Sequence, residues 1–138
     1  MIDHTADVAI QAYGKTLKKL FASAAEGMID LMVGGSKPKG SGVQFREKTV
    51  TIKNAVDREQ LLVNWLQELL YIFDAEKLIP CEFDILELSD CCLKAKVSSI
   101  PLDLKIHKLK HQIKAVTHHN LAVKRGAGQF DVTVIFDI

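Results

Sequence analysis

Apolar residues recur at helical spacing in two stretches of the chain and alternate at strand spacing in most of the rest. A stripe with a period near 3.6 residues runs through 17–32, and a wider one runs from 58 to 73. The first stripe contains Leu17, Leu20, Phe21, Ala24, Met28, Leu31 and Met32; the second contains Leu61, Leu62, Trp65, Leu66, Leu69, Leu70 and Phe73. The pattern therefore predicts two amphipathic helices, and the width of the second stripe makes that helix the main core element.

The flanking residues indicate where these helices begin and end. Thr16 offers a hydroxyl N-cap to the first helix, and Gly34-Gly35 is expected to end it. Asp57 followed three residues later by Gln60 matches a capping box at the start of the second helix. The Gly-, Pro- and Lys-rich run 36–42 between the helices predicts a mobile surface loop.

Alternation with period two predicts the strands. It is seen in 8–13, ending at Gly14, in 43–53, in a hairpin formed by 83–88 and 93–97 around a Ser89-Asp90 turn, and in 130–136 after a turn at 125–128. Further extended stretches are expected at 102–106, 113–117 and 120–123. The order of elements predicts an α+β fold: a single domain over residues 1–138, with a mostly antiparallel sheet packed by two amphipathic helices.

Composition narrows the class of protein. Apolar residues make up 48% of the 138 residues, and 18 Lys and Arg stand against 17 Asp and Glu, giving a net charge of +1. This balance of charge argues against a dedicated nucleic-acid binder. The basic run 105–111 with Lys114 has two interpretations. It could contact phosphate or an acidic partner, or it could be a solvated strand edge protected by lysines. No apolar segment is long enough to cross a membrane and no leader peptide is recognisable, so we expect a cytoplasmic protein with no membrane partner.

The three cysteines point to a reducing compartment. Their number is odd, Cys91 and Cys92 are adjacent, and neighbouring cysteines rarely pair with each other. No Cys-x-x-Cys spacing suggests a metal site. All three are expected to be reduced and to act as buried or half-buried small apolar residues.

The sequence assembles no catalytic set. It has neither a glycine-rich phosphate loop nor a nucleophile elbow. The pair His107 and His111 would share a face only on a helix, and His118 and His119 would point to opposite faces of a strand, so transition-metal chemistry is weakly supported.

Acidic residues stand close to both ends of the chain. It opens with Asp3-His4-Thr5-Ala6-Asp7 and finishes with Phe136-Asp137-Ile138. If the first and last strands meet, Asp7, Asp137 and the carboxyl end of Ile138 offer the oxygen ligands that hard divalent cations prefer. From the residues alone, two interpretations stay open: a cation site, or an ordinary acidic chain end with no such role.

The chain resembles the archease family. The resemblance rests on the opening motif Asp3–Asp7, on Gly14-x-Thr16-Leu17 with Phe21, on the run 61–70, on Ile113-Lys114-Ala115-Val116-Thr117 with His119, and on the closing Phe136-Asp137-Ile138. These landmarks span nearly the whole chain. His118 stands where the family usually has a tyrosine.

The resemblance implies an accessory protein and not an enzyme. Archeases assist the RtcB class of RNA ligase in tRNA splicing and RNA repair, by promoting guanylylation of the ligase and its multiple turnover. By this resemblance, the protein contacts the guanine nucleotide and the RNA only indirectly, through the ligase. The resemblance also implies a divalent metal ion, calcium first with magnesium or manganese as alternatives, held by Asp7, Asp137 and Ile138. It assigns an activating role to Lys114 and places Asp3, His4 and His119 at the partner site.

Two other classes of function remain open at this point. A metal-dependent phosphoester hydrolase would use Asp7 and His4 to activate water. A general chaperone or RNA-binding module would use the surface of residues 105–114.

Overall fold

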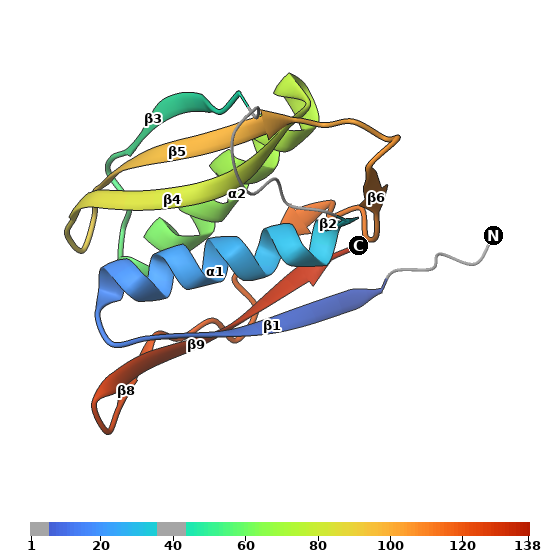
Figure 1. Cartoon of the computed structure of the whole chain (residues 1–138). Coiled ribbons are helices and arrows are strands. Elements are labelled where there is room, and N and C mark those ends of the chain that lie inside the picture. Colours follow the sequence, from blue (N-terminus) through green and yellow to red (C-terminus); the bar gives the residue numbers. More distant parts are fainter. Residues whose placement is uncertain (1–5, 36–43) are drawn as a thin grey trace.

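Two helices lie as a middle layer between two antiparallel sheets. The computed structural model describes residues 6–35 and 44–138. Its elements are β1 (Asp7–Gly14), α1 (Leu17–Met32), β2 (Val33–Gly35), β3 (Arg46–Ile52), α2 (Arg58–Glu76), β4 (Leu78–Leu88), β5 (Leu93–Pro101), β6 (His107–Leu109), β7 (Ala115–Val116), β8 (Lys124–Gly126) and β9 (Gln129–Asp137). Figure 1 shows α1 and α2 between the sheet of β3, β5 and β4 on one side and the strands β1 and β9 on the other. The α+β class predicted from the sequence is confirmed.

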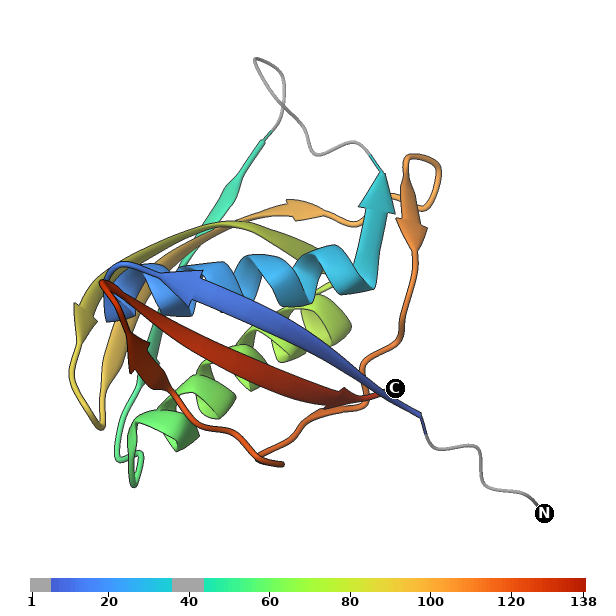
Figure 2. The same ribbon diagram turned by 90° about the horizontal axis from the view of Figure 1, so that it is seen from below.

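The first sheet joins the two ends of the chain. Its order is β1–β9–β7, with β8 also pairing with β9, and every pairing is antiparallel. β1 and β9 pair without interruption from Asp7 opposite Asp137 to Gly14 opposite Phe130. Figure 2, seen from the side of this sheet, shows these two strands running side by side in front of the helices.

The second sheet is built around the predicted hairpin. β5 lies in the centre, with β3 and β4 antiparallel on its two sides. The register of β4 shifts between Pro80 and Glu82 and again between Ile85 and Glu87, as β-bulges do. A further two-stranded ladder pairs β2 with β6.

The caps predicted for both helices are present. The N–H of Lys19 donates to Thr16 Oγ1 (3.1 Å), and the N–H of Gln60 donates to Asp57 Oδ1 (2.8 Å). Gln60 Oε1 in turn accepts the N–H of Val56 (2.8 Å), one residue earlier than in the usual capping box. The bonds to Thr16 and Asp57 each satisfy a donor that the first turn of a helix leaves unpaired, which fixes where α1 and α2 begin.

Trp65 on α2 packs against both the other helix and the second sheet. Its ring is fully buried, and its Nε1–H donates to the main-chain oxygen of Phe21 on α1 (3.1 Å). On the sheet side it meets Phe83 of β4 edge to face, with ring centroids 6.0 Å apart. The prediction that Trp65 and its neighbours form the core is confirmed, since Leu61, Leu62, Leu66 and Leu69 are also fully buried.

Several boundaries differ from the sequence prediction. The residues expected to end the first helix, Gly34-Gly35, lie in a short strand, because Val33 is already extended and β2 pairs with β6. The stretch 102–106 is a turn and not a strand: Asp103 accepts the N–H of Lys105 through its side chain (3.0 Å) and the N–H of Ile106 through its carbonyl (3.0 Å).

The remaining differences lie in the strands of the last third and in one loop. The strand expected at 113–117 is limited to 115–116, and the stretch 120–123 is irregular, with the strand following at 124–126. The strand expected at 43–53 spans 46–52. The loop prediction for 36–42 falls outside the described residues. Within the described part of the chain, neither helix is long and apolar enough to cross a membrane.

Candidate functional site at the ends of β1 and β9

Asp7 and Asp137 lie directly opposite each other where β1 begins and β9 ends. The N–H of Ile138 donates to the carbonyl of Ala6 (3.0 Å), so residues 6 and 138 form a hydrogen-bonded pair. The next pair along the ladder, Asp7 and Asp137, is therefore of the non-hydrogen-bonded type, in which the strands approach more closely. The expectation that the first and last strands meet is confirmed, and it places the two carboxylates side by side, since opposite residues share one face.

Both carboxylates face solvent. The side chain of Phe136 is fully buried in the core, so the alternation of β9 turns Asp137 outward. The same alternation applies to β1, where Asp7 is exposed and Val8 is half-buried against the core. Because the apolar residues of β1 and β9 occupy the inner face of the sheet, the side chains of Asp7 and Asp137 both point outward into solvent.

A third segment brings Lys114 to the same end of the sheet. β7 pairs with β9 so that Ala115 lies opposite Asp137, and the N–H of Lys114 donates to the carbonyl of Asp137 (2.7 Å). The flanking Ile113 and Val116 are 3% and 4% exposed and anchor this segment in the core. Lys114 itself is exposed, and its main chain lies directly beside that of Asp137.

The donor set fits a hard cation better than a transition metal. It consists of two carboxylates and the main-chain oxygen atoms of Ile138, with water completing the six to eight ligands that calcium takes. Across residues 6–35 and 44–138, no three His, Cys, Asp or Glu side chains gather into a metal-binding cluster. Asp3 and His4, which the resemblance places at this site, lie outside the described residues.

His119 lies farther from the acidic pair than Lys114. Thr117 forms two bonds to the carbonyl of Ile135, from its N–H (3.0 Å) and its hydroxyl (2.9 Å), so the chain after β7 runs away from the end of β9. His119, whose N–H donates to Thr117 Oγ1 (3.3 Å), follows on an exposed loop.

The basic run 105–111 does not form one charged face. His107 is 6% exposed, and its Nδ1 accepts the N–H of Asp103 (2.9 Å). Lys110 Nζ donates to the carbonyl of Asp30 at the end of α1 (3.0 Å). Lys105 and Lys108 remain exposed, and this arrangement is typical of a sheet edge protected by lysines.

The fold and the site together define a class: a small α+β protein with a helical layer between antiparallel sheets and an acidic tip formed by its first and last strands. The model of the "Archease protein family (MTH1598/TM1083)" matches residues 1–138. The chain belongs to the archease family.

Curated relatives and solved structures agree with this assignment. The chain is 33% identical to the protein archease of Methanosarcina mazei, over 99% of this chain and 93% of the relative. It is 34% identical to the protein archease of Saccharolobus islandicus, over 99% and 95% of the two chains. The solution structure of protein 1598 from Methanobacterium thermoautotrophicum is similar, with a TM-score of 0.68, 28% identity and coverage of 99% and 96%.

A second solved structure supports the fold alone. It is the crystal structure of an archease, described as a possible chaperone, from Thermotoga maritima. Its TM-score is 0.67 at 20% identity, and the alignment covers 100% of this chain and 95% of that one.

The sequence reasoning missed one polar cluster, in the turn between β4 and β5. Cys91 was expected to be buried or half-buried and is exposed, whereas Cys81 and Cys92 are half-buried as expected. The signal was present in the sequence, because the Ser89-Asp90 turn that the hairpin requires leads directly into Cys91 and exposes the residues that follow it.

Proposed function

We propose that this protein is a cytoplasmic accessory activator of an RtcB-class RNA ligase, promoting guanylylation of the ligase and its multiple turnover in tRNA splicing and RNA repair. Membership of the archease family supports the proposal. So does the site, because an exposed acidic pair with an adjacent lysine is suited to contacting another protein and encloses no substrate. The observation that carries it is the strand register, which brings Asp7, Asp137 and Lys114 from three distant parts of the sequence to one tip.

The same tip is the proposed cation site. Asp7, Asp137 and Ile138 would hold the ion, with calcium favoured over magnesium or manganese because the ligands are oxygens on an open, adaptable surface. A bound divalent cation would supply positive charge to a tip that otherwise carries two adjacent negative charges. Asp3 and His4 enter the proposal through the resemblance alone.

Lys114 would bring a positive charge of this protein into contact with the ligase. Its ammonium can contact a phosphate of the guanine nucleotide held by the ligase, or a carboxylate of the ligase itself. Phosphoryl and nucleotidyl transfers are helped mainly by positioning and by charge placed near the reacting phosphates. Its main-chain bond to Asp137 fixes where the lysine leaves the sheet, and His119 offers a further exposed polar group on the loop beyond β7.

The test measures ligase guanylylation and RNA joining under multiple turnover, with the ligase from the same source, with and without this protein. The wild type is compared with Asp7→Asn, Asp137→Asn and Lys114→Ala. Asp131→Asn is the matched control, because Asp131 lies on the same strand and the same face as Asp137 but at the other end of β9. We expect stimulation by the wild type and the control, and little stimulation by the other three.

Each alternative outcome excludes a part of the proposal. Full stimulation by a folded Asp137→Asn variant would exclude the acidic tip as the acting site. No stimulation by the wild type would exclude the ligase as the partner. Phosphoester turnover by the protein alone would favour the hydrolase, and salt-sensitive RNA binding without any ligase would favour an RNA-binding module.

A further inference from the structure

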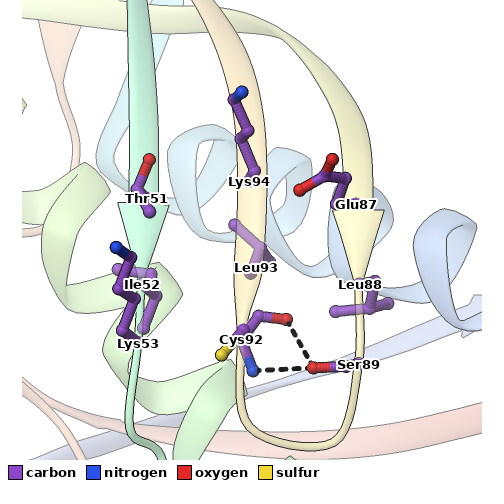
Figure 3. Close-up of a pocket in the computed structure, with 9 residues that line it drawn as sticks. All are labelled: Thr51, Ile52, Lys53, Glu87, Leu88, Ser89, Cys92, Leu93 and Lys94. Carbon is purple, nitrogen blue, oxygen red and sulfur yellow. Dashed lines mark hydrogen bonds between the residues drawn. The ribbon is translucent and has the colours of Figure 1, made fainter.

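The turn between β4 and β5 brings two cysteine sulfurs together. Cys91 Sγ lies 3.5 Å from Cys92 Sγ, with Cys91 exposed and Cys92 half-buried. In an extended strand, neighbouring side chains point to opposite faces, so this approach depends on the turn. Cys92 lines an open pocket of about 500 Å³. Figure 3 shows Lys53, just after β3, and Lys94, farther along β5, among the other residues of its lining.

Hydrogen bonds hold the turn in this conformation. Ser89 Oγ accepts the N–H of Cys92 (3.1 Å) and the N–H of Cys91 (3.4 Å), and the N–H of Ser89 donates to the carbonyl of Cys92 (2.9 Å). The carbonyl of Cys91 accepts the N–H of Ala55 from the segment before α2 (3.0 Å). These bonds fix the main chain of the turn that carries the two thiols.

A second set of contacts ties the turn to the start of α2. Arg58 in the first turn of α2 forms an ion pair with Asp90 at the tip of the hairpin (2.9 Å). Both partners are substantially exposed, so the pair adds little stability and mainly favours one position of the hairpin tip.

The surroundings of Cys92 favour its thiolate. Its pKa is lowered chiefly because the thiol of Cys91 donates a hydrogen bond to its sulfur, and next because the main-chain N–H of Asn54 does the same. The ammonium of Lys53 adds a smaller electrostatic contribution in the same direction. Since the thiolate is the nucleophile, Cys92 is the more reactive member of an accessible pair that has a second thiol in contact.

We propose that Cys91 and Cys92 form a reversible two-electron redox site, which a hydroperoxide oxidises to a disulfide between the two neighbouring residues. This site lies outside the acidic tip, and it stands whether or not the protein activates a ligase. The proposal rests on the sulfur-to-sulfur distance and on the exposure of the turn.

The reaction balances in two steps. The thiolate sulfur of Cys92 attacks one oxygen of hydrogen peroxide; the O–O bond breaks, and the departing hydroxide takes a proton to form water. Cys92 is then a sulfenic acid. The sulfur of Cys91 attacks the sulfur of that sulfenic acid, the S–O bond breaks, and the released hydroxide takes the proton of the Cys91 thiol, giving a second water and the disulfide. Two electrons pass from the two sulfurs to the peroxide.

The product should be easily reduced. The Cα atoms of adjacent residues are about 3.8 Å apart, which is shorter than the range of about 4.4–6.8 Å for ordinary disulfides. A strained, exposed disulfide is the labile kind, and two equivalents of a small thiol such as glutathione would restore both cysteines through a mixed disulfide. Because of this strain, adjacent cysteines rarely form a permanent structural disulfide, but they can form one that is readily reduced.

The test treats the full-length protein with hydrogen peroxide and follows intact mass, free thiols and peptide maps. We expect a mass loss of about 2 Da, disappearance of two of the three thiols and recovery on adding glutathione. In Cys91→Ser the sulfenic acid on Cys92 should persist and be trapped by dimedone. In Cys92→Ser oxidation should be slower by about tenfold, because the more nucleophilic thiolate is absent.

Cys81→Ser is the matched control, since Cys81 lies in the same hairpin but far along β4 from the turn. Its oxidation should keep within about twofold of the wild-type rate. Oxidation of all three cysteines at similar rates, a disulfide between two molecules, or conversion of Cys92 to sulfinic acid without a disulfide would each overturn the proposal.

Discussion

Replacing Asp137 by Asn should change the stability of this protein in opposite directions with and without a divalent cation. Asp7 and Asp137 are like charges opposite each other on an exposed face. At a separation of about 5 Å in water their repulsion is about 0.8 kcal/mol, and salt lowers it to about 0.5 kcal/mol. Without a cation the variant should therefore be more stable by about 0.5 kcal/mol, which is about 2 °C in the melting temperature of a chain of this length.

The order should reverse when the cation is present. Calcium at about 100 times its dissociation constant stabilises a protein that binds it only when folded by about 2.7 kcal/mol, or about 9 °C here. Asp137→Asn removes one of the two carboxylates and should lose most of this gain. The assay is thermal unfolding followed by circular dichroism, first with a chelator and then across a calcium titration.

Two results would refute this reasoning. If Asp137→Asn is less stable than the wild type in chelator, its carboxylate makes a structural contact that outweighs the repulsion. If calcium stabilises the wild type and the variant equally, the cation binds elsewhere. Asp131→Asn serves as the control, because it removes the same charge from the same face without disturbing the pair.

Three further predictions concern the core and Lys114. Gly14→Ala should lower the free energy of unfolding by more than about 3 kcal/mol in urea denaturation, because a Cβ there would collide with the backbone nitrogen of Leu20. Trp65→Phe should lower it by about 2 kcal/mol on the same assay, since the buried carbonyl of Phe21 loses its partner; a change under about 0.5 kcal/mol would show that this bond adds little. Lys114→Ala should leave the free energy of unfolding within about 0.5 kcal/mol of the wild type, because the main-chain bond to Asp137 remains. Stimulation of the ligase should fall. A large loss of stability would instead give the lysine a structural role.

The elements that could be predicted from the sequence are those whose signal is local. Thr16 and the pair Asp57 and Gln60 cap their helices through side chains within a few residues of the bonds they make. The alternation of β9 and the stripe around Trp65 likewise report which face is buried. The short strands were missed because partners distant in the sequence determine them. β2 exists through its pairing with β6, which the pattern of 33–35 does not encode.

The candidate site was predictable only in part. The acidic residues could be read from the sequence, but their meeting depends on the register of β1 on β9, for which the hydrophobic alternation fixes the face and not the exact partner. The residues alone group Lys114 with the basic run 105–111, and only the resemblance to a family gives it a role of its own, because the bond that brings it to Asp137 joins segments far apart in the sequence. The cysteine pair was missed for a different reason: because neighbouring cysteines rarely pair, Cys91 and Cys92 were interpreted as small apolar residues, whereas the turn brings their sulfur atoms to 3.5 Å.

The acidic tip and the cysteine pair should behave as independent sites. Both views place the hairpin of β4 and β5 at the end of the molecule where α1 begins, and the end of β9 at the opposite end (Figures 1 and 2). The 16 residues of α1, about 24 Å of helix, run between these ends. Perturbations this far apart with no shared partner add in free energy to within about 0.5 kcal/mol.

The double variant Asp137→Asn/Cys91→Ser tests this independence. Its melting shift in calcium should equal the sum of the two single shifts, and peroxide treatment of the wild type should leave its calcium stabilisation unchanged. A deviation larger than about 0.5 kcal/mol would mean that the helical layer transmits strain between the hairpin and the tip. In that case the oxidation state of the cysteines would influence the acidic tip, and the close-packed residues around Trp65 would be the first path to test by mutation.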